Sequence, residues 1–141
     1  MYILKVESSF DSAHFLAGHQ GKCRNIHGHS WKVVAEVESA SLVSEGESRG
    51  MVVDFSQLKK DMRQSVGFYD HALLVETGTL RKTTMEHLVN DGFRIIEVGF
   101  RTTAENFAKF FYDALSDKGY EVTRVSVFET PSNCAVYEGK R

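Results

Sequence analysis

The chain has 141 residues, 42% hydrophobic and 26% charged, which predicts one soluble domain spanning residues 1–141. A formal net charge of −2 argues against a nucleic-acid partner, since such partners require a basic surface. No apolar run approaches the length of a membrane span, and MYILKVESSF lacks the features of a secretory signal. Only Cys23 and Cys134 are cysteines, which predicts no disulfide scaffold and a cytoplasmic setting.

Two alternating segments near the N-terminus predict an antiparallel pair of strands. In residues 2–14 and 27–38, apolar and polar side chains alternate, as in half-buried strands. His14 falls on the apolar face of the first strand, and His27 and His29 fall on that of the second. The loop that joins the strands carries a thiol.

Two helices are predicted from their capping residues and apolar stripes. The first begins at the N-cap Asp54 and runs to Val66, and the second has Thr102 and Glu105 as a capping box and ends at Gly119. The apolar stripe of the first helix is Phe55, Leu58, Met62 and Val66, and that of the second is Phe107, Phe110, Phe111, Ala114 and Leu115.

The remaining segments complete the predicted fold. Residues 77–92 are the least regular and predict a short helix around 85–89, followed by a short strand within 93–98. Two further strands are predicted at 122–130 and 134–137. The resulting order predicts an α+β domain whose helices pack on one face of an antiparallel sheet.

Three histidines converge if the first two strands pair. His27 and His29 are two residues apart on a strand, so both imidazoles point to one side. A register that places His14 beside His29 brings three imidazoles onto one sheet face, which is the ligand set of a catalytic zinc site with an open position. The alternative is that each is a hydrogen-bonded core residue. His19 and His87 show no such convergence and are expected in loops or at the surface.

Cys23 precedes the histidine pair in a Cys-x3-His-x-His pattern and has three alternative roles. It can close a structural metal site as a fourth ligand, or act as a free thiolate, nucleophile or general base, beside an open site. The third role is that of a small buried hydrophobe, which is less expected for Cys23 because its neighbours Lys22, Arg24 and Asn25 are polar. That role fits Cys134 better.

Two acidic positions also suggest chemistry. Asp70 precedes His71 after the first predicted helix, and an adjacent carboxylate can fix the tautomer of an imidazole. The alternative is a helix-end aspartate followed by a loop histidine. Glu129 shares parity with Val125 and Val127, which predicts an inward carboxylate. Such a group needs a partner, and the paired N–H donors of a guanidine-like ring edge fit it.

Taken together, several segments resemble the 6-pyruvoyltetrahydropterin synthase / 6-carboxytetrahydropterin synthase family. The resemblance runs in order over nearly the whole chain, and its combination of motifs is specific. The segments are FDSAH (10–14), CRNIHGH (23–29), MVVDFSQLK (51–59), YDHALL (69–74), TTAEN (102–106) and FETPSNCAVY (128–137).

The resemblance implies a tunnelling fold: a four-stranded antiparallel sheet with two helices on one face, in the order β-β-α-α-β-β. It further implies trimers that close their sheets into a β-barrel, and a homohexamer of two trimers with active sites between subunits. It implies Zn²⁺ on the three converging histidines. Glu129 is implied as the anchor of the pterin ring, with Thr103 and Glu105 near the ring pocket.

The resemblance also implies a reaction. Cys23 is implied as the proton-abstracting base, with Asp70 and His71 as a linked proton relay. The three-residue gap 24–26 between the cysteine and the His-Gly-His element resembles the carboxy-forming enzymes of queuosine biosynthesis. The implied activity is a zinc-dependent lyase that converts 7,8-dihydroneopterin triphosphate into 6-carboxytetrahydropterin, acetaldehyde and triphosphate.

Three other functions remain open at this point. One is the pyruvoyl-forming synthase, with the same metal and substrate. Another is a non-catalytic pterin-binding zinc protein in which Cys23 closes the metal site, and a third is a zinc hydrolase with an unrelated substrate. The chain departs from the family pattern at Thr102, where proline is usual, at Val75, where asparagine is frequent, and over the longer segment 77–100.

Overall fold

The computed structural model describes residues 1–139. Nine regular helices and strands and one short 3-10 helix follow one another within this range. In chain order they are β1 (Tyr2–His14), the 3-10 helix (Lys22–Arg24), β2 (His27–Ser39), α1 (Phe55–Gly67), β3 (Leu73–Glu76), α2 (Lys82–Asn90), β4 (Ile95–Val98), α3 (Ala104–Asp117), β5 (Val122–Thr130) and β6 (Asn133–Glu138).

The strands form one sheet in the order β4-β3-β1-β2-β5-β6. The pairs β1–β2, β2–β5 and β5–β6 are antiparallel, whereas β1–β3 and β3–β4 are parallel. The expectation of a four-stranded antiparallel sheet was therefore wrong, because two short strands extend one edge in parallel. The predicted α+β class is confirmed.

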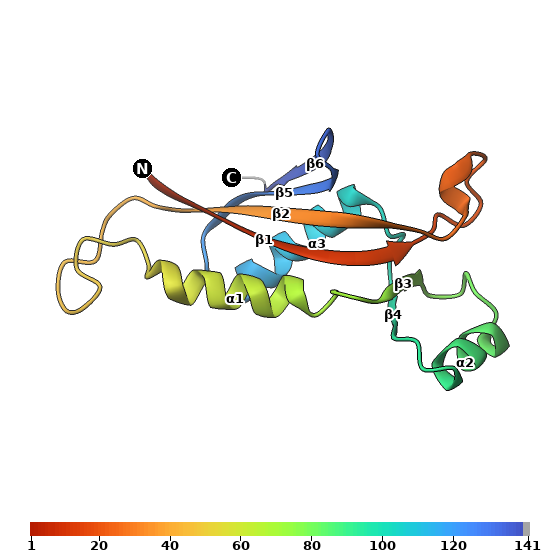
Figure 1. Cartoon of the computed structure of the whole chain (residues 1–141). Helices are drawn as coiled ribbons and strands as arrows, with labels where there is room; N and C mark the ends of the chain where they lie inside the picture. The colour runs from red at the N-terminus through yellow and green to blue at the C-terminus, as the bar shows by residue number, and fades with distance from the viewer. Residues whose placement is uncertain (140–141) are drawn as a thin grey trace.

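The two long helices, α1 and α3, cover one face of the sheet, as expected, while α2 stands apart beyond β3 and β4 (Figure 1). The short helix expected around residues 85–89 is confirmed and extends over Lys82–Asn90. None of its side chains is buried, so α2 contributes nothing to the central core.

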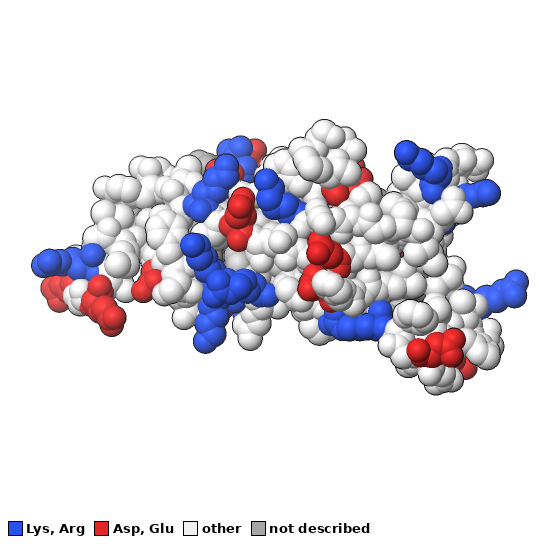
Figure 2. All heavy atoms as spheres, viewed as in Figure 1, with Lys and Arg blue, Asp and Glu red and all other residues white. Residues whose placement is uncertain are grey.

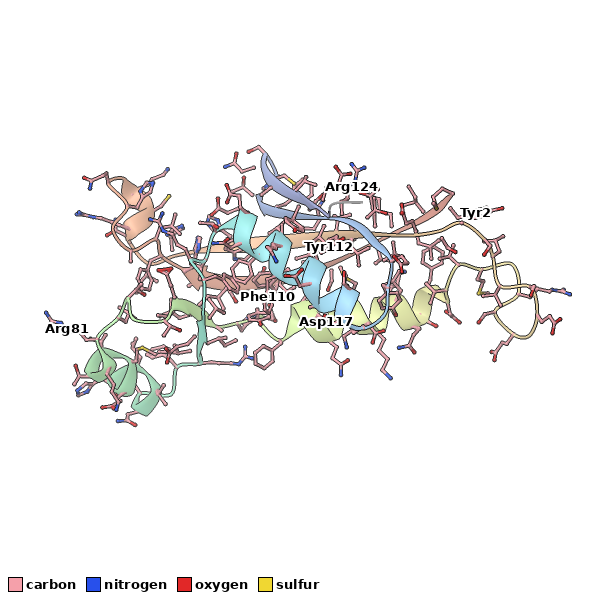
Figure 3. The ribbon with its side chains drawn as sticks, turned by 180° about the vertical axis from the view of Figure 1, so that it is seen from behind. Tyr2, Arg81, Phe110, Tyr112, Asp117 and Arg124 are labelled. Carbon is pink, nitrogen blue, oxygen red and sulfur yellow. The ribbon has the colours of Figure 1, made fainter. Side chains whose placement is uncertain are left out.

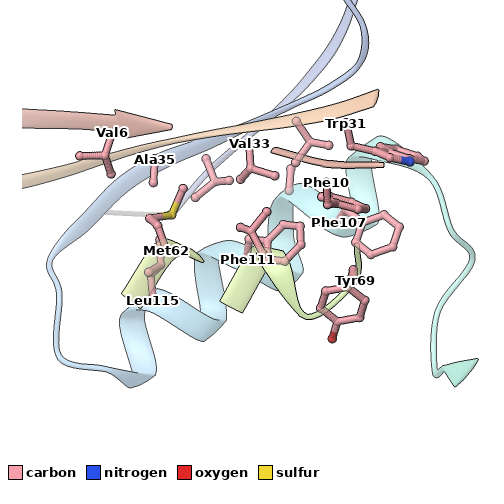
Figure 4. Packing of buried hydrophobic residues seen from close by; sticks show 14 of the residues in the cluster. Val6, Phe10, Trp31, Val33, Ala35, Met62, Tyr69, Phe107, Phe111 and Leu115 are labelled. Atoms are coloured by element: carbon pink, nitrogen blue, oxygen red, sulfur yellow. The ribbon is translucent and has the colours of Figure 1, made fainter. Parts of the chain in front are cut away.

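The core lies between the sheet and helices α1 and α3 and is rich in aromatic rings (Figure 4). Phe10 on β1 is paired with Trp31 on β2, and their rings stack with centroids 5.6 Å apart. Phe107 and Phe111 of α3 pack against Phe10 at 5.9 and 6.0 Å. Burying each such side chain stabilises the fold by about 1.5–3 kcal/mol, so this cluster firmly holds the end of the sheet that carries the histidines.

The helix caps confirm one expectation and correct another. Asp54 caps α1 by accepting a hydrogen bond from the amide of Ser56 at 2.8 Å. Helix α3 is capped by Thr103, which accepts from the amide of Asn106. The predicted capping box began one residue too early. Thr102 is fully buried, and its carbonyl accepts a hydrogen bond from a histidine.

The surface mixes charges of both signs. On the face shown in Figure 2, acidic side chains are interspersed with basic ones, which gather mainly over α1. Seen from behind, Tyr2 and Arg81 lie near opposite ends of the molecule, and α3 runs along the sheet between them (Figure 3). Within residues 1–139, no helix has the length and hydropathy of a membrane span.

Candidate metal centre

The three histidines lie together on the sheet face that packs against the helices. His14 is paired directly with His27, and His29 lies one pair further along the same face. The ring centroid of His14 lies 4.6 Å from that of His27 and 5.1 Å from that of His29. The parity argument is confirmed, but the expected register, with His14 beside His29, was wrong by two residues of β2.

Glu129 on β5 joins this group. Its carboxylate and one nitrogen from each of His14, His27 and His29 all lie within 4.8 Å of one another. The carboxylate oxygen Oε1 is 3.4 Å from Nε2 of His14 and 3.3 Å from Nε2 of His29. The inward direction predicted from strand parity is confirmed, and the structure adds that Glu129 reaches the histidines.

Backbone carbonyls fix the orientation of two imidazoles. Nδ1 of His14 donates to the carbonyl of Thr102 at 2.7 Å, and Nδ1 of His27 donates to the carbonyl of Asn25 at 2.6 Å. A carbonyl can only accept, so Nδ1 carries the proton and the lone pair lies on Nε2. Metal-binding histidines typically have this outer hydrogen bond, which aims the other nitrogen at the ion.

Burial keeps the imidazoles of His14 and His29 neutral. His14 is fully buried beside the indole of Trp31, with ring centroids 4.8 Å apart. This burial lowers the pKa of His14 to about 4. Burial also lowers the pKa of His29, although the carboxylate of Glu129 opposes that shift. At neutral pH both rings are therefore unprotonated, which is the form that binds a metal ion.

The donor atoms fit a zinc ion. Within residues 1–139, Nε2 of His14 and Nε2 of His29 are buried and have no hydrogen-bond partner. A buried nitrogen without a partner costs free energy, and a cation at this point would satisfy both. Imidazole nitrogens with a carboxylate oxygen are ligands that zinc accepts. The residues present therefore fit the metal that the sequence suggested.

Cys23 lies in the short 3-10 helix Lys22–Arg24 and is half-buried and free. The carbonyl of Cys23 accepts from the amide of Leu16 at 2.8 Å, which ties its loop to the chain beyond β1. Its sulfur is not part of the four-residue ligand group among the described residues. The structure therefore does not favour the alternative in which Cys23 closes the metal site.

Asp70 and His71 form a linked pair at the edge of β1. Oδ2 of Asp70 accepts from Nδ1 of His71 at 2.8 Å, and Oδ1 accepts from the amide of Asp11 at 2.7 Å. The bond from Asp11, followed by that from His71, lowers the pKa of Asp70. The side chain of His71 is 78% exposed. In the described chain neither residue belongs to the ligand group.

Two hollows adjoin these residues. A groove of about 720 Å³ is lined by both His29 and His71. A second hollow of about 320 Å³ is lined by Thr103, Glu105 and Glu129, the three residues expected to bind a ring. Cys134 also lines this second hollow and is exposed, so its interpretation as a small buried hydrophobe was wrong.

Sequence reasoning missed the groups that support the ligands. Main-chain carbonyls carry no sequence signal, so the roles of Thr102 and Asn25 were not visible. The indole of Trp31 was recognised only as an apolar position on β2. His19 and His87 are exposed, as expected, although His87 lies on α2 and not in a loop.

The fold and this site define a family. Residues 3–140 match the profile of the 6-pyruvoyl tetrahydropterin synthase family, so the chain belongs to that family. A relative from Haemophilus influenzae, named 6-carboxy-5,6,7,8-tetrahydropterin synthase, is 35% identical over 98% of this chain and 99% of its own length. A relative of the same name from Synechocystis is 41% identical over 61% of this chain and 67% of its own length.

Solved structures share the fold. A protein from Wolinella succinogenes superposes with a TM-score of 0.77 at 21% identity, covering 99% of this chain and 100% of its own. A 6-pyruvoyltetrahydropterin synthase from Plasmodium vivax gives 0.74 at 23% identity, covering 99% and 98%. Both structures are less than 25% identical to this chain in sequence, so the comparison shows a shared fold alone.

Proposed function

We propose that this chain is a zinc-dependent lyase that converts 7,8-dihydroneopterin triphosphate and one water molecule into 6-carboxy-5,6,7,8-tetrahydropterin, acetaldehyde and triphosphate, in queuosine biosynthesis. The observation that carries the proposal is the group of three imidazoles beside the hollow that Glu129 lines. Its support is the 35% identity to a relative named for this product.

His14, His27 and His29 would hold the zinc ion through Nε2. When bound, zinc polarises hydroxyl oxygens of the substrate side chain and so acidifies the neighbouring C–H. The carboxylate of Glu129 would accept hydrogen bonds from the paired N–H donors on the edge of the pterin ring. It would thereby hold the substrate side chain at reacting distance. Thr103 and Glu105 line the same hollow.

Proton transfer would fall to three side chains. Cys23 would take the C–H proton as its thiolate. Asp70 fixes the tautomer of His71 through their 2.8 Å bond, and the pair would move the next proton. The family resemblance implies active sites between subunits, and the side chain of His71 is highly exposed. This pair would therefore act on the metal centre of a neighbouring subunit in a homohexamer built from two barrel-forming trimers.

Mixed assemblies test this shared site. Cys23→Ala and His71→Ala proteins are each expected to be inactive. When they are unfolded together and reassembled, some sites combine an intact cysteine from one subunit with an intact histidine from another, so activity is expected to return. Mixtures that stay inactive although light scattering shows hexamers would contradict a site shared between subunits.

Product analysis tests the reaction. The purified protein is incubated with 7,8-dihydroneopterin triphosphate, and the products are identified by mass spectrometry with a chemical trap for acetaldehyde. The three-residue gap 24–26 supports the cleaving reaction. Accumulation of 6-pyruvoyltetrahydropterin without aldehyde would instead support the pyruvoyl-forming reaction, after which the matching family is named.

A further inference from the structure

The backbone at His71 is strained and is held from several sides. His71 has φ of 52°, and it is the one non-glycine residue with positive φ among residues 1–139. This left-handed conformation is unfavourable for an ordinary L-residue, so it persists only where surrounding contacts fix it. The residues that fix it therefore decide where the imidazole points.

One set of contacts comes from β1. The amide of His71 donates to the carbonyl of Asp11 at 2.6 Å, and the amide of Ala13 donates to the carbonyl of Ala72 at 2.9 Å. Together with the bond from the amide of Asp11 to Asp70, these contacts secure one side of the turn formed by residues 68–71.

The other side is held by Arg94, which immediately precedes β4. Nη1 of Arg94 donates to the carbonyl of Asp70 at 2.6 Å, and Nη2 donates to the carbonyl of Phe68. The guanidinium carbon lies 5.2 Å from the centre of the Phe68 ring. The carbonyl of Arg94 accepts from the amide of Leu73 at 3.0 Å. A single residue thus contacts the turn on both sides of the Asp70–His71 pair.

The contact with Asp70 bears directly on φ of His71. The carbonyl of Asp70 and the amide of His71 belong to the same peptide unit, whose orientation depends on φ of His71 and ψ of Asp70. Arg94 holds the carbonyl end and Asp11 holds the amide end, each at 2.6 Å. Rotation of this peptide unit would break both bonds at once.

We propose that Arg94 is a positioning residue for the Asp70–His71 pair, which makes the segment 77–100 a support for proton transfer. The inference rests on the proposed function, in which this pair moves a proton. The chain leaves the turn along β3, passes through α2 and returns along β4 (Figure 1). That return places the guanidinium of Arg94 against the turn. A lysine lacks the planar fork that reaches two carbonyls and the flat face that stacks on a ring.

The test compares Arg94→Ala, Arg94→Lys and a control in the full-length protein. In Arg94→Ala, kcat is expected to fall about 10- to 100-fold through misplacement of His71, with full zinc content and KM within about twofold of wild type. Arg94→Lys keeps the charge and is expected to resemble Arg94→Ala. Arg124→Ala removes an arginine that bridges Glu36 and Glu138 at 3.3 and 3.2 Å, and is expected to keep wild-type kcat.

The overturning results are specific. Wild-type kcat in Arg94→Ala, or a loss of kcat matched by loss of zinc, would remove the positioning role. If Arg94→Ala does not fold, Arg94→Lys gives the same reading. A crystal structure of either variant supplies a measurement independent of activity: φ of His71 is expected to leave the left-handed region, and an unchanged φ refutes the inference. Full activity of His71→Ala would instead contradict the proton relay of the proposed function, whatever the dihedral angle shows.

Discussion

Nδ1 of His14 lies 2.7 Å from the carbonyl oxygen of Thr102, a residue 88 positions further along the chain. This contact joins the end of β1 to the segment just before α3. It fixes the tautomer of a fully buried imidazole and turns its lone pair towards His29 and Glu129. The candidate metal centre is thus assembled from both halves of the chain and depends on the fold being complete.

Replacing His14 is expected to remove zinc and leave the fold. His14→Ala deletes one of three imidazole ligands, so zinc affinity is expected to fall by more than about tenfold. Trp31 contacts His14, but Phe10, Phe107 and Phe111 also pack on one another, so thermal unfolding should remain cooperative. Elemental analysis measures the metal, with His87→Ala, an exposed histidine on α2, as the control that keeps it. Full zinc occupancy in His14→Ala would disprove the assignment.

Replacing Cys23 is expected to separate catalysis from metal binding. Cys23→Ala should retain zinc and bind the pterin substrate, while kcat falls at least about 100-fold, as for loss of a general base. Zinc content and turnover are measured on the same preparation. If zinc disappears together with activity, Cys23 is a ligand and the site is of the closed, structural kind.

Glu129→Gln distinguishes ring binding from metal binding. The substitution keeps the volume of the side chain but removes its charge. If Glu129 holds the ring edge, the lost charge-assisted bonds, about 1.5–3 kcal/mol, raise KM about 10- to 100-fold while zinc stays bound. The 3.3 and 3.4 Å distances to His29 and His14 provide the rival outcome, in which zinc is lost because the carboxylate is a fourth ligand.

A hydrogen bond far from the metal centre predicts a pH-dependent stability. Tyr120 donates to Oδ2 of Asp61 at 2.6 Å. This bond lowers the pKa of Asp61 from its ordinary value of 3.8, while burial, and secondarily the bond, raise the pKa of Tyr120 from 10.0 to about 12. The stabilisation from Asp61 is present above pH 3.8 and is lost as the pH falls through its lowered pKa. That from Tyr120 is present below pH 10.0 and is lost as the pH rises through about 12.

Tyr120→Phe is therefore expected to lower the free energy of unfolding by about 1 kcal/mol at neutral pH. The difference from wild type should shrink at strongly acid pH and again at strongly alkaline pH. Urea unfolding across this range provides the measurement. Tyr112→Phe on α3 is the control, because its ring packs on Tyr137 at 5.0 Å and, among residues 1–139, its hydroxyl has no comparable bond to a carboxylate. A constant difference at every pH would contradict the role of Asp61.

Much of the fold was visible in the sequence because burial imposes a period on it. The alternation in β1 and β2 predicted which face His14, His27 and His29 occupy. It did not predict their register, because a shift by two residues leaves every side chain on the same face. The stacked pair of Phe10 and Trp31 is formed only in the observed register, and this preference becomes visible only once the strands are paired.

The missed features were either short or made by the main chain. Leu73–Glu76 has four residues and no alternation, so nothing in it signalled a strand. Two adjacent threonines, Thr102 and Thr103, each fit a helix cap, and only packing shows that the first is buried. Arg94 binds the turn through hydrogen bonds to main-chain carbonyl groups. Every residue has such a group, so no sequence motif reveals the contact.

The lack of buried side chains on α2 has a practical consequence for work with this protein. A fluorophore coupled through a cysteine introduced at Arg81, the residue before α2, which lies near one end of the molecule (Figure 3), is expected to report on this segment without disturbing the interior. The same freedom makes this stretch a natural site for sequence drift between species. We expect that variation to stop at Arg94, because this residue is held by its hydrogen bonds to the turn before β3.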